Sequence, residues 1–151
     1  METMKRIRTA NVNDIEQVRV FLGQAEVSAE GIESIIDHFI LMEDHEQNIL
    51  ATLGIERIEE DGLLRSLVIS PGVDQTNLLT LFKSAISLAK HKEISGLFLA
   101  TNKQASIQFF AMLGFSQVEE DLLPNHIKNS NHIAQLLENA DPMFMVSQIE
   151  K

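Results

Sequence analysis

The sequence lacks cysteine, tryptophan and tyrosine, and it holds only three prolines and seven glycines among its 151 residues. Without cysteine, the chain can form neither disulfides nor thiolate metal sites, and it has no cysteine nucleophile. The missing tyrosine removes one of the side chains that enzymes use to transfer protons. The chemistry of any active site must therefore come from carboxylates, histidines, hydroxyls, basic groups or the main chain.

Long hydrophobic runs are also missing. Every apolar stretch is far shorter than the roughly 20 residues that cross a bilayer as a helix. The first ten residues, METMKRIRTA, do not contain the hydrophobic stretch of a signal peptide. We therefore expect a cytoplasmic protein that does not bind membranes.

Basic residues are outnumbered, since 12 Lys and Arg face 22 Asp and Glu, for a formal net charge of -10. Such a chain repels nucleic-acid phosphates unless it has a basic patch, and Lys90, Lys92 and Lys103 do not form one. We therefore expect no nucleic-acid partner. A hydrophobic content of 44% in 151 residues suits one domain with a sizeable core, spanning residues 1–151.

The central feature of the sequence is residues 63–90, which read LLRSLVIS, PGVDQTN and LLTLFKSAISLAK. The first piece is apolar and suits a buried strand, and the last has apolar residues at helical spacing. Pro71-Gly72 predicts a turn between them. A strand that enters a helix through a turn directs the unpaired amides of the helix at one point, where an anion can bind.

The remaining patterns alternate between strands and helices. The order is β-α-α-β-β-β-α-β-α-β-α-β, with a hairpin turn at residues 60–62. This order predicts an α/β fold (α+β in some schemes) in which a mixed sheet carries helices on both faces. The strands are expected within 5–9, 39–42, 49–58, 63–69, 96–101, 115–120 and 142–149, and the helices within 13–22, from 28, 78–90, 104–113 and 124–138.

Three of these segments, DGLLRSLVISP, GLFLAT and IQFFAMLGF, resemble the GNAT superfamily of N-acetyltransferases. The resemblance covers nearly the whole chain and implies a mixed, mostly antiparallel sheet. It also implies an acetyl-CoA-dependent N-acetyltransferase, in which a small amine attacks the thioester directly.

The resemblance further implies a set of cofactor contacts. The main chain of the strand matching residues 63–69 would bind the pantetheine arm, and the following turn would cradle the pyrophosphate. Asn102 and Phe110 match positions beside the cofactor. The cofactor-binding candidates are Leu67, Val68, Ile69, Gln75, Thr76, Asn77, Asn102 and Phe110.

Two features depart from the family pattern. The glycines that let phosphate approach the main chain are missing from residues 73–78, and Asp74 stands among them. As a favoured helix N-cap, its carboxylate can take the place of the phosphate, or it can cap the helix while the phosphates bind nearer solvent. In addition, Phe109 and Phe110 stand where family members often place a proton-donating tyrosine, and the alternative for both is a role in the core.

Glu56 is the candidate base that removes a proton from the amine. It lies in the strand ILATLGIERI, next to the strand expected to hold the pantetheine arm. Arg65 on that adjacent strand is expected to orient an anionic substrate or to pair with Glu56, and Phe39 is the second candidate substrate residue. The alternative for Glu56 is an exposed carboxylate paired with Arg57 or Arg65.

Metal binding is not expected, because the five histidines include no pair at i,i+4 spacing. The stretch HIKNSNH is predicted to lie on a solvated helix. Exposed strand edges and Met143 and Met145 allow a homodimer. The alternative to the enzyme is a catalytically inactive GNAT-fold binding or regulatory module with a degraded coenzyme A site.

Overall fold

A computed structural model describes residues 5–101, 104–139 and 141–149. The chain forms two compact units. Unit 1 comprises Met1–Glu56 and Arg65–Leu88, and unit 2 comprises Arg57–Leu64 and Ala89–Lys151. Within the described ranges, no helix has the length and apolar character needed to cross a membrane.

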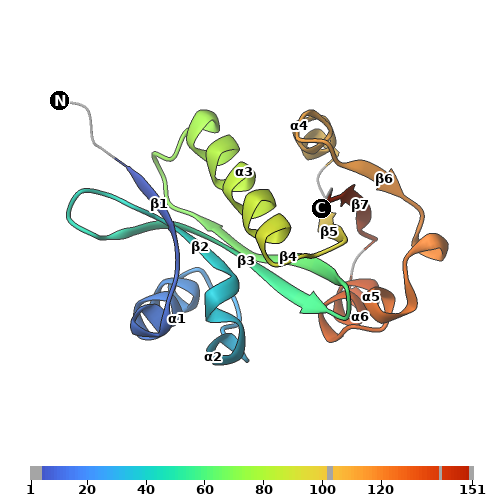
Figure 1. The fold of residues 1–151 in the computed structure, drawn as a ribbon, viewed down its shortest axis with the longest axis horizontal. Coiled ribbons are helices and arrows are strands. Elements are labelled where there is room, and N and C mark those ends of the chain that lie inside the picture. Colours follow the sequence, from blue (N-terminus) through green and yellow to red (C-terminus); the bar gives the residue numbers. More distant parts are fainter. Residues whose placement is uncertain (1–4, 102–103, 140, 150–151) are drawn as a thin grey trace. The chain divides into compact units, whose positions relative to one another are not determined.

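The strands and helices follow the predicted alternation (Figure 1). The strands are β1 (Arg6–Thr9), β2 (Phe39–Glu43), β3 (Ile49–Ile58), β4 (Asp61–Ile69), β5 (Gly96–Thr101), β6 (Ser116–Val118) and β7 (Met143–Gln148). The α-helices are α1 (Ile15–Gln24), α2 (Ile32–Ile35), α3 (Gln75–His91), α4 (Ala105–Met112), α5 (Asn125–Lys128) and α6 (Asn131–Asn139), and the 3-10 helices are η1 (Val12–Asp14), η2 (Ile36–His38) and η3 (Glu120–Leu122).

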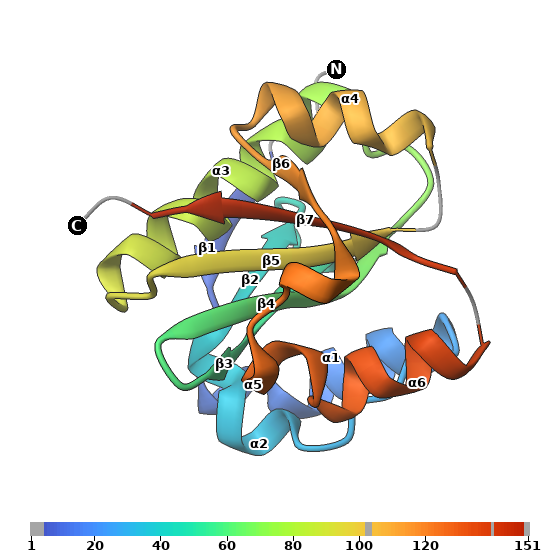
Figure 2. The same cartoon turned by 90° about the vertical axis from the view of Figure 1, so that its right-hand side faces the viewer.

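The strands form one seven-stranded sheet in the order β1-β2-β3-β4-β5-β7-β6. β1 with β2, β2 with β3, β5 with β7 and β6 with β7 are antiparallel, whereas β4 pairs with β5 in parallel through Gly62 and Leu63. In unit 1, α1 and α2 lie on one side of the strands and α3 on the other (Figure 1). In unit 2, α4 lies on one side of its strands and α5 and α6 on the other (Figure 2). The predicted mixed sheet with helices on both faces is confirmed.

The core of unit 1 is built by apolar residues of α1, α2 and β2. Val18 and Leu22 of α1 are fully buried and pack with Ile32 and Phe39. Gly54 pairs with Phe39 across β2 and β3, and a Cβ at Gly54 would lie 2.7 Å from the Phe39 ring. The glycine is therefore needed for close approach of the ring, and the ring covers the main chain of β3.

The core of unit 2 joins β4, β5 and β7 to the helices that follow β6. Leu63, Phe98 and Phe144 supply the strand side, and Ile127 and Ile133 supply the side of α5 and α6. All five are less than 6% exposed, so α5 and α6 are held by burial of their apolar faces rather than by helix propensity.

Three predicted boundaries were wrong. The hairpin turn lies at Glu59-Glu60, and β4 already begins at Asp61. The expected helix 124–138 is two helices, because Ser130 accepts a hydrogen bond from the Ile133 amide and starts a new helix. The segment from 28 yields only the short α2 and a 3-10 turn. In the last two cases, hydrogen bonds of Ser130 and of Ser28 and Ser34 interrupt an apolar pattern that continues through them.

A buried charge network ties β1 to β2 and η1. Arg8 donates to both carboxylate oxygens of Asp14, at 2.8 and 2.7 Å, and to both of Glu43, at 3.0 and 3.1 Å. Asp14 also accepts from the Asn11 amide and completes a capping box. The hydrogen bonds from Arg8 lower the pKa of Asp14, and those from Asp14 raise the pKa of Arg8.

We predict that Asp14→Asn lowers the free energy of unfolding by about 2 kcal/mol at pH 7, because it removes a charge-assisted contact. Since folding lowers the pKa of Asp14, its contribution is complete above the ordinary value of about 3.9 and is lost as the pH falls through the folded value. Urea unfolding of both proteins between pH 7 and pH 3 measures the difference, which should narrow below about pH 4. A difference independent of pH would contradict this origin.

Candidate functional site

The second half of β4 departs from regular strand geometry. Ser66 has φ +59°, a left-handed conformation inside the strand. The hydroxyl of Thr52, which is 0% exposed, donates to the Ser66 carbonyl at 2.9 Å. A left-handed residue is costly for a side chain with Cβ, so the bond from β3 holds the irregularity in place. The regular geometry of β4 is therefore interrupted at Ser66.

The residues after Ser66 alternate between the surface and the interior. Leu67 and Ile69 are 38% and 37% exposed, whereas Val68 packs against the core of unit 1. An exposed apolar strand face fits the pantetheine arm of coenzyme A, which is itself partly apolar. Val68 turns its side chain toward the core, which leaves its main chain as the part expected to contact the arm.

The turn into α3 fits phosphate less well. Gly72 has φ +96° and nothing within 4 Å of a Cβ position, so the main chain is open there. Asp74, however, accepts a hydrogen bond from the Asn77 amide at 2.8 Å and caps α3 as the sequence predicted. The carboxylate occupies one amide of the helix turn formed by Gln75, Thr76 and Asn77. In the conformation described, β4 thus fits the arm of the cofactor, but the helix end carries a negative charge where phosphates would bind.

Asn77 adds a second feature at this helix end. Its side-chain oxygen Oδ1 is buried and has no hydrogen-bond partner within the ranges that the structure describes. An unpaired buried carbonyl oxygen is costly, so this end of α3 is not optimised for stability alone.

Glu56 and Arg65 form an ion pair between β3 and β4. Arg65 Nη1 donates to Glu56 Oε1 at 2.6 Å, and their side chains are 20% and 28% exposed. The sequence left open whether Glu56 pairs with Arg57 or Arg65, and the structure selects Arg65. Arg57 instead donates to the main-chain oxygens of Lys92 and Glu59. The bond engages one carboxylate oxygen, and a carboxylate has a second oxygen that can accept a proton.

Arg65 also lines a small pocket of unit 1, together with Ser66 and Phe39. The pocket leaves no space for a water molecule in the conformation described. Phe39 is 1% exposed, so its ring forms wall rather than surface. Phe39 and Arg65, two candidate residues from separate parts of the sequence, therefore line the same pocket beside the left-handed residue of β4, and Arg65 is bonded to Glu56.

The candidate Phe110 belongs to unit 2. Phe110 is 9% exposed and packs edge-on against Phe109 and Phe115, with ring centroids 5.5 and 6.0 Å apart, in unit 2. This packing agrees with the alternative of a core role. Asn102 lies outside the described residues.

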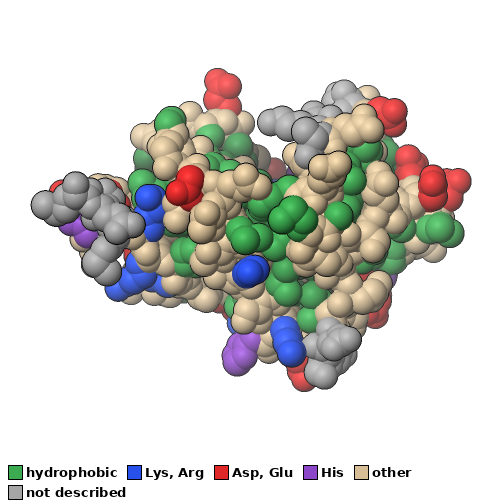
Figure 3. Space-filling view, turned by 90° about the horizontal axis from the view of Figure 1, so that it is seen from above, with side chains coloured by type: hydrophobic (Ala, Val, Ile, Leu, Met, Phe, Trp, Pro, Cys, Tyr) green, Lys and Arg blue, Asp and Glu red, His purple; other side chains and the backbone are tan. Residues whose placement is uncertain are grey.

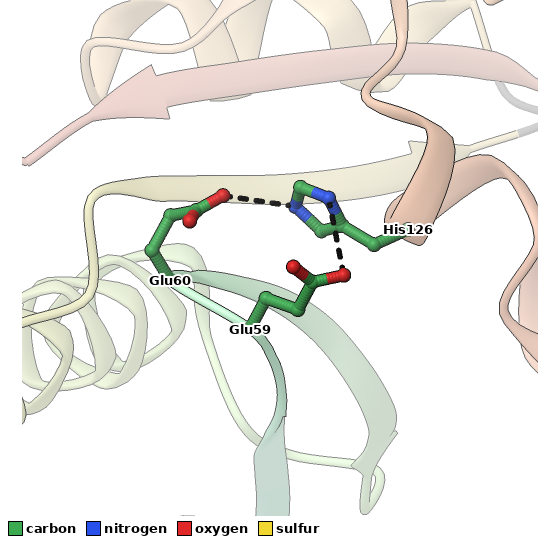
Figure 4. A group of neighbouring side chains, drawn as sticks. All are labelled: Glu59, Glu60 and His126. Carbon is green, nitrogen blue, oxygen red and sulfur yellow. Dashed lines mark ion pairs between the residues drawn. The ribbon is translucent and has the colours of Figure 1, made fainter.

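A cluster that the sequence did not predict lies at the β3–β4 turn (Figure 4). His126 of α5 donates from Nε2 to Asp61 Oδ2 at 2.6 Å, and Glu60 and Glu59 lie 3.5 and 3.7 Å from its ring nitrogens. Asp61 is 7% exposed, and its other oxygen accepts from the Gly96 amide at 2.9 Å. The prediction of a solvated histidine stretch was wrong for His126, because a carboxylate 65 residues away is buried against it.

Glu59, Glu60 and His126 are also a group able to hold a metal ion. One donor atom from each lies within 4.8 Å of the others. The nitrogen and carboxylate donors suit a divalent ion such as zinc. Two of the three side chains are more than 60% exposed, and the direct hydrogen bond to Asp61 accounts for the position of His126 without an ion. Helix spacing could not reveal this group, because its members come from a turn and a distant helix.

On the face drawn in Figure 3, charged side chains are scattered rather than gathered into one patch. Figure 3 views the face that carries α3 and shows acidic, basic and hydrophobic side chains intermixed. The excess of carboxylates therefore affects the whole molecule, and an anionic ligand must be bound by local donors.

We compared the chain with known protein families and with curated proteins. No family model matches the chain. The uncharacterized protein YwlB of Bacillus subtilis is 35% identical over 141 residues, which cover 93% of this chain and 95% of YwlB. The chain belongs to the YwlB family.

Solved structures similar to this YwlB-family protein are acetyltransferases. N-acetylglutamate synthase from Neisseria gonorrhoeae, complexed with coenzyme A and N-acetyl-glutamate, matches with a TM-score of 0.78 and 22% identity over 100% of this chain. The chain spans 36% of that synthase. An acetyltransferase of the GNAT family from Staphylococcus aureus matches with a TM-score of 0.73 and 20% identity over 97% of this chain and 100% of its own. The fold is therefore the GNAT fold, and the resemblance seen in the sequence is confirmed at that level.

The Asp61 contacts predict a stability effect in unit 2. Asp61→Ala should lower the free energy of unfolding by ~1–3 kcal/mol, because the Gly96 amide is left buried without an acceptor. The matched control is Glu60→Ala, which removes an exposed carboxylate beside the same histidine and should change stability by less than ~0.5 kcal/mol. Urea unfolding monitored by circular dichroism measures both. Equal effects would show that the buried hydrogen bond is not the cause.

Proposed function

We propose that this protein is an acetyl-CoA-dependent N-acetyltransferase that acts on a small amine. The observation that carries the proposal is the meeting of Glu56, Arg65 and left-handed Ser66 on β3 and β4 of a GNAT fold. The complex of the Neisseria synthase with coenzyme A and N-acetyl-glutamate supports it as a structural precedent.

In this proposal Glu56 is the catalytic base. It accepts a proton from the amine, directly or through water, and Arg65 holds its Oε1 so that Oε2 turns to the acceptor. The bound thioester supplies an activated acetyl carbonyl. Main-chain amides near Val68 would donate to the oxygen of that carbonyl and stabilise negative charge on it.

The chain has no tyrosine that could donate a proton to the departing thiolate sulfur. Phe109 and Phe110 stand in the helix where a hydroxyl is often found in the family, and both are apolar. A positioned acid typically contributes ~10²–10⁴-fold, so its absence slows the step without preventing it. Water protonates the thiolate in its place.

The Asp74 cap favours a second function. A carboxylate bonded to the Asn77 amide occupies a donor that phosphate needs, and two unit charges ~4 Å apart repel by about 1 kcal/mol in water and about 4 kcal/mol at an effective dielectric of 20. A protein that never displaces Asp74 would be a GNAT-fold binding module without acetyl transfer.

Calorimetric titration of acetyl-CoA into three proteins separates these functions. Asp74→Asn keeps a capping side chain but removes the charge, whereas Asp74→Gly removes both. We expect micromolar binding by the wild type, with affinity rising at least about tenfold in Asp74→Gly and less in Asp74→Asn, because about 1.4 kcal/mol of repulsion is one factor of ten.

The salt dependence serves as the control, since removal of Asp74 should also steepen the loss of affinity with added salt. Binding only by Asp74→Gly would favour the module. No binding by any of the three proteins would contradict a coenzyme A site on this chain.

Glu56→Gln tests the base. Gln preserves the contact with Arg65 but takes up no proton, so kcat should fall by ~10²–10⁴-fold while acetyl-CoA affinity stays unchanged. Release of the coenzyme A thiol can be followed with a thiol reagent, because the chain contains no cysteine of its own. A variant with wild-type kcat would exclude Glu56 as the base.

A further inference from the structure

Thr52 is a buried polar residue of β3 that the sequence did not single out. Its hydroxyl donates to the main-chain oxygen of Ser66 at 2.9 Å, and the residue is 0% exposed. We propose that Thr52 is a positioning residue for acetyl transfer, which holds Ser66 left-handed and thereby directs the main-chain amide of Leu67 at the acetyl carbonyl of the thioester. This inference rests on the proposed function, since it names the donor of the same site and the residue that orients it.

The side chains of β4 show that one step of the strand alternation is skipped at Ser66. Arg65 lines the same small pocket as Leu22 and Phe39, and Val68 packs against the cluster that contains Leu22 and Phe39. Residues three apart in a regular strand face opposite sides of the sheet, because side chains alternate with a period of two. Arg65 and Val68 nevertheless share a side. Ser66, with φ +59°, lies between them and accounts for the change.

The left-handed conformation of Ser66 needs support from outside the residue. A positive φ is uncommon for a residue that carries a Cβ, whereas glycine adopts it readily. The Thr52 hydroxyl supplies the support, because its bond to the Ser66 carbonyl forms only when that carbonyl turns toward Thr52. Loss of the bond would also leave a fully buried hydroxyl without its acceptor, so both partners favour this one arrangement.

The same hydrogen bond fixes the direction of the Leu67 N–H. The Ser66 carbonyl and the Leu67 N–H belong to one planar peptide unit, which is trans like the other peptide bonds of the described residues, so the two groups point in opposite directions. Because the carbonyl points to Thr52 on β3, the N–H points away from it. Among the described residues of unit 1, β4 is the last strand beyond β3, so within this unit the N–H is directed to a side with no further strand.

An amide directed in this way can stabilise the transition state of acetyl transfer. The acceptor nitrogen loses a proton to Glu56 and attacks the acetyl carbon, so a C–N bond forms and negative charge develops on the carbonyl oxygen. The C–S bond then breaks, and the sulfur leaves with its electron pair and takes a proton from water. A donor that is already fixed in place stabilises the charged oxygen without having to reorganise.

The test measures the carbonyl of bound acetyl-CoA without any acceptor. The probe is acetyl-CoA with an isotope label at the acetyl carbonyl carbon, and difference infrared spectroscopy gives the stretching frequency, which falls as the carbonyl accepts a stronger hydrogen bond. Thr52→Val has nearly the same shape but no hydroxyl, and it should raise the frequency above the wild-type value. Thr52→Ser is the matched control, because it keeps the hydroxyl and should retain the wild-type frequency.

Variants of Ser66 test whether Thr52 acts through this residue. In the Thr52→Val background, Ser66→Gly removes the Cβ that disfavours a positive φ, so the double variant should recover part or all of the wild-type frequency. Ser66→Val leaves the buried Thr52 in place but makes the left-handed conformation costly, so it should raise the frequency by itself. The melting temperature of each variant shows that it is folded, and Ser66→Val provides the test if Thr52→Val is not.

Two further readouts accompany the spectrum. In the protein without ligand, the NMR coupling between the amide and α protons of Ser66 reports φ, and Thr52→Val should move it toward the value of an extended residue. With any amine that the wild type acetylates, Thr52→Val should lower kcat by roughly 10²-fold and change KM for acetyl-CoA less, because the loss falls on the transition state.

The outcomes separate this inference from the proposed function. If the wild type binds acetyl-CoA but Thr52→Val leaves the carbonyl frequency unchanged, or if Ser66→Gly does not reverse the shift, the inference is overturned and the proposed function stands. If the wild type does not bind acetyl-CoA, the proposed function fails and the role of Thr52 in acetyl transfer is overturned with it. A changed Ser66 coupling would then show only that Thr52 sets the conformation of β4.

Discussion

The hydrogen bond from the buried Thr52 hydroxyl to the Ser66 carbonyl fixes the shape of the site in unit 1. It holds one left-handed residue inside β4. Before that residue, positions 61–64 of β4 are buried and Arg65 is partly buried, and after it Leu67 and Ile69 reach the surface. Arg65, next to Ser66, meets Glu56 and lines the pocket. A regular strand would continue the burial pattern of its first half and would expose no apolar face to a ligand.

Charge sets the second constraint. The chain has a net charge of -10, and its arginines form ion pairs with specific carboxylates. Arg8 pairs with Asp14 and Glu43, and Arg65 pairs with Glu56. His126 of α5 likewise lies close to three carboxylates at the β3–β4 turn. Helix α3 has no such cation at its N-terminus in the described contacts, and Asp74 meets its amides instead. Whether the Asp74 carboxylate or a phosphate of coenzyme A occupies these amides distinguishes the proposed enzyme from the proposed binding module.

Much of the fold could be predicted because strong local signals coincide with it. Residues 49–58 and 96–101 form strands with the predicted bounds, and the helix after Pro71-Gly72 is present as α3. Signals were weakest where polar residues decide the boundary. Ser130 divides a helix that apolar spacing alone would continue, and Asp61 belongs to a strand although Asp-Gly is typical of a turn. Asp61 lies in the strand rather than the turn because its carboxylate accepts hydrogen bonds from the Gly96 amide and from His126.

The sequence by itself determined the fold class, the Asp74 cap and the absence of thiol and phenol chemistry, because each follows from residue type and local spacing. The likeness to N-acetyltransferases came from the resemblance of three segments to that family. Only the tertiary structure decided that Glu56 pairs with Arg65 rather than Arg57, that Phe39 covers Gly54, and that His126 is buried against Asp61. These contacts join residues 9, 15 and 65 positions apart, and which of several chemically equivalent partners lies within reach is set by strand register and packing.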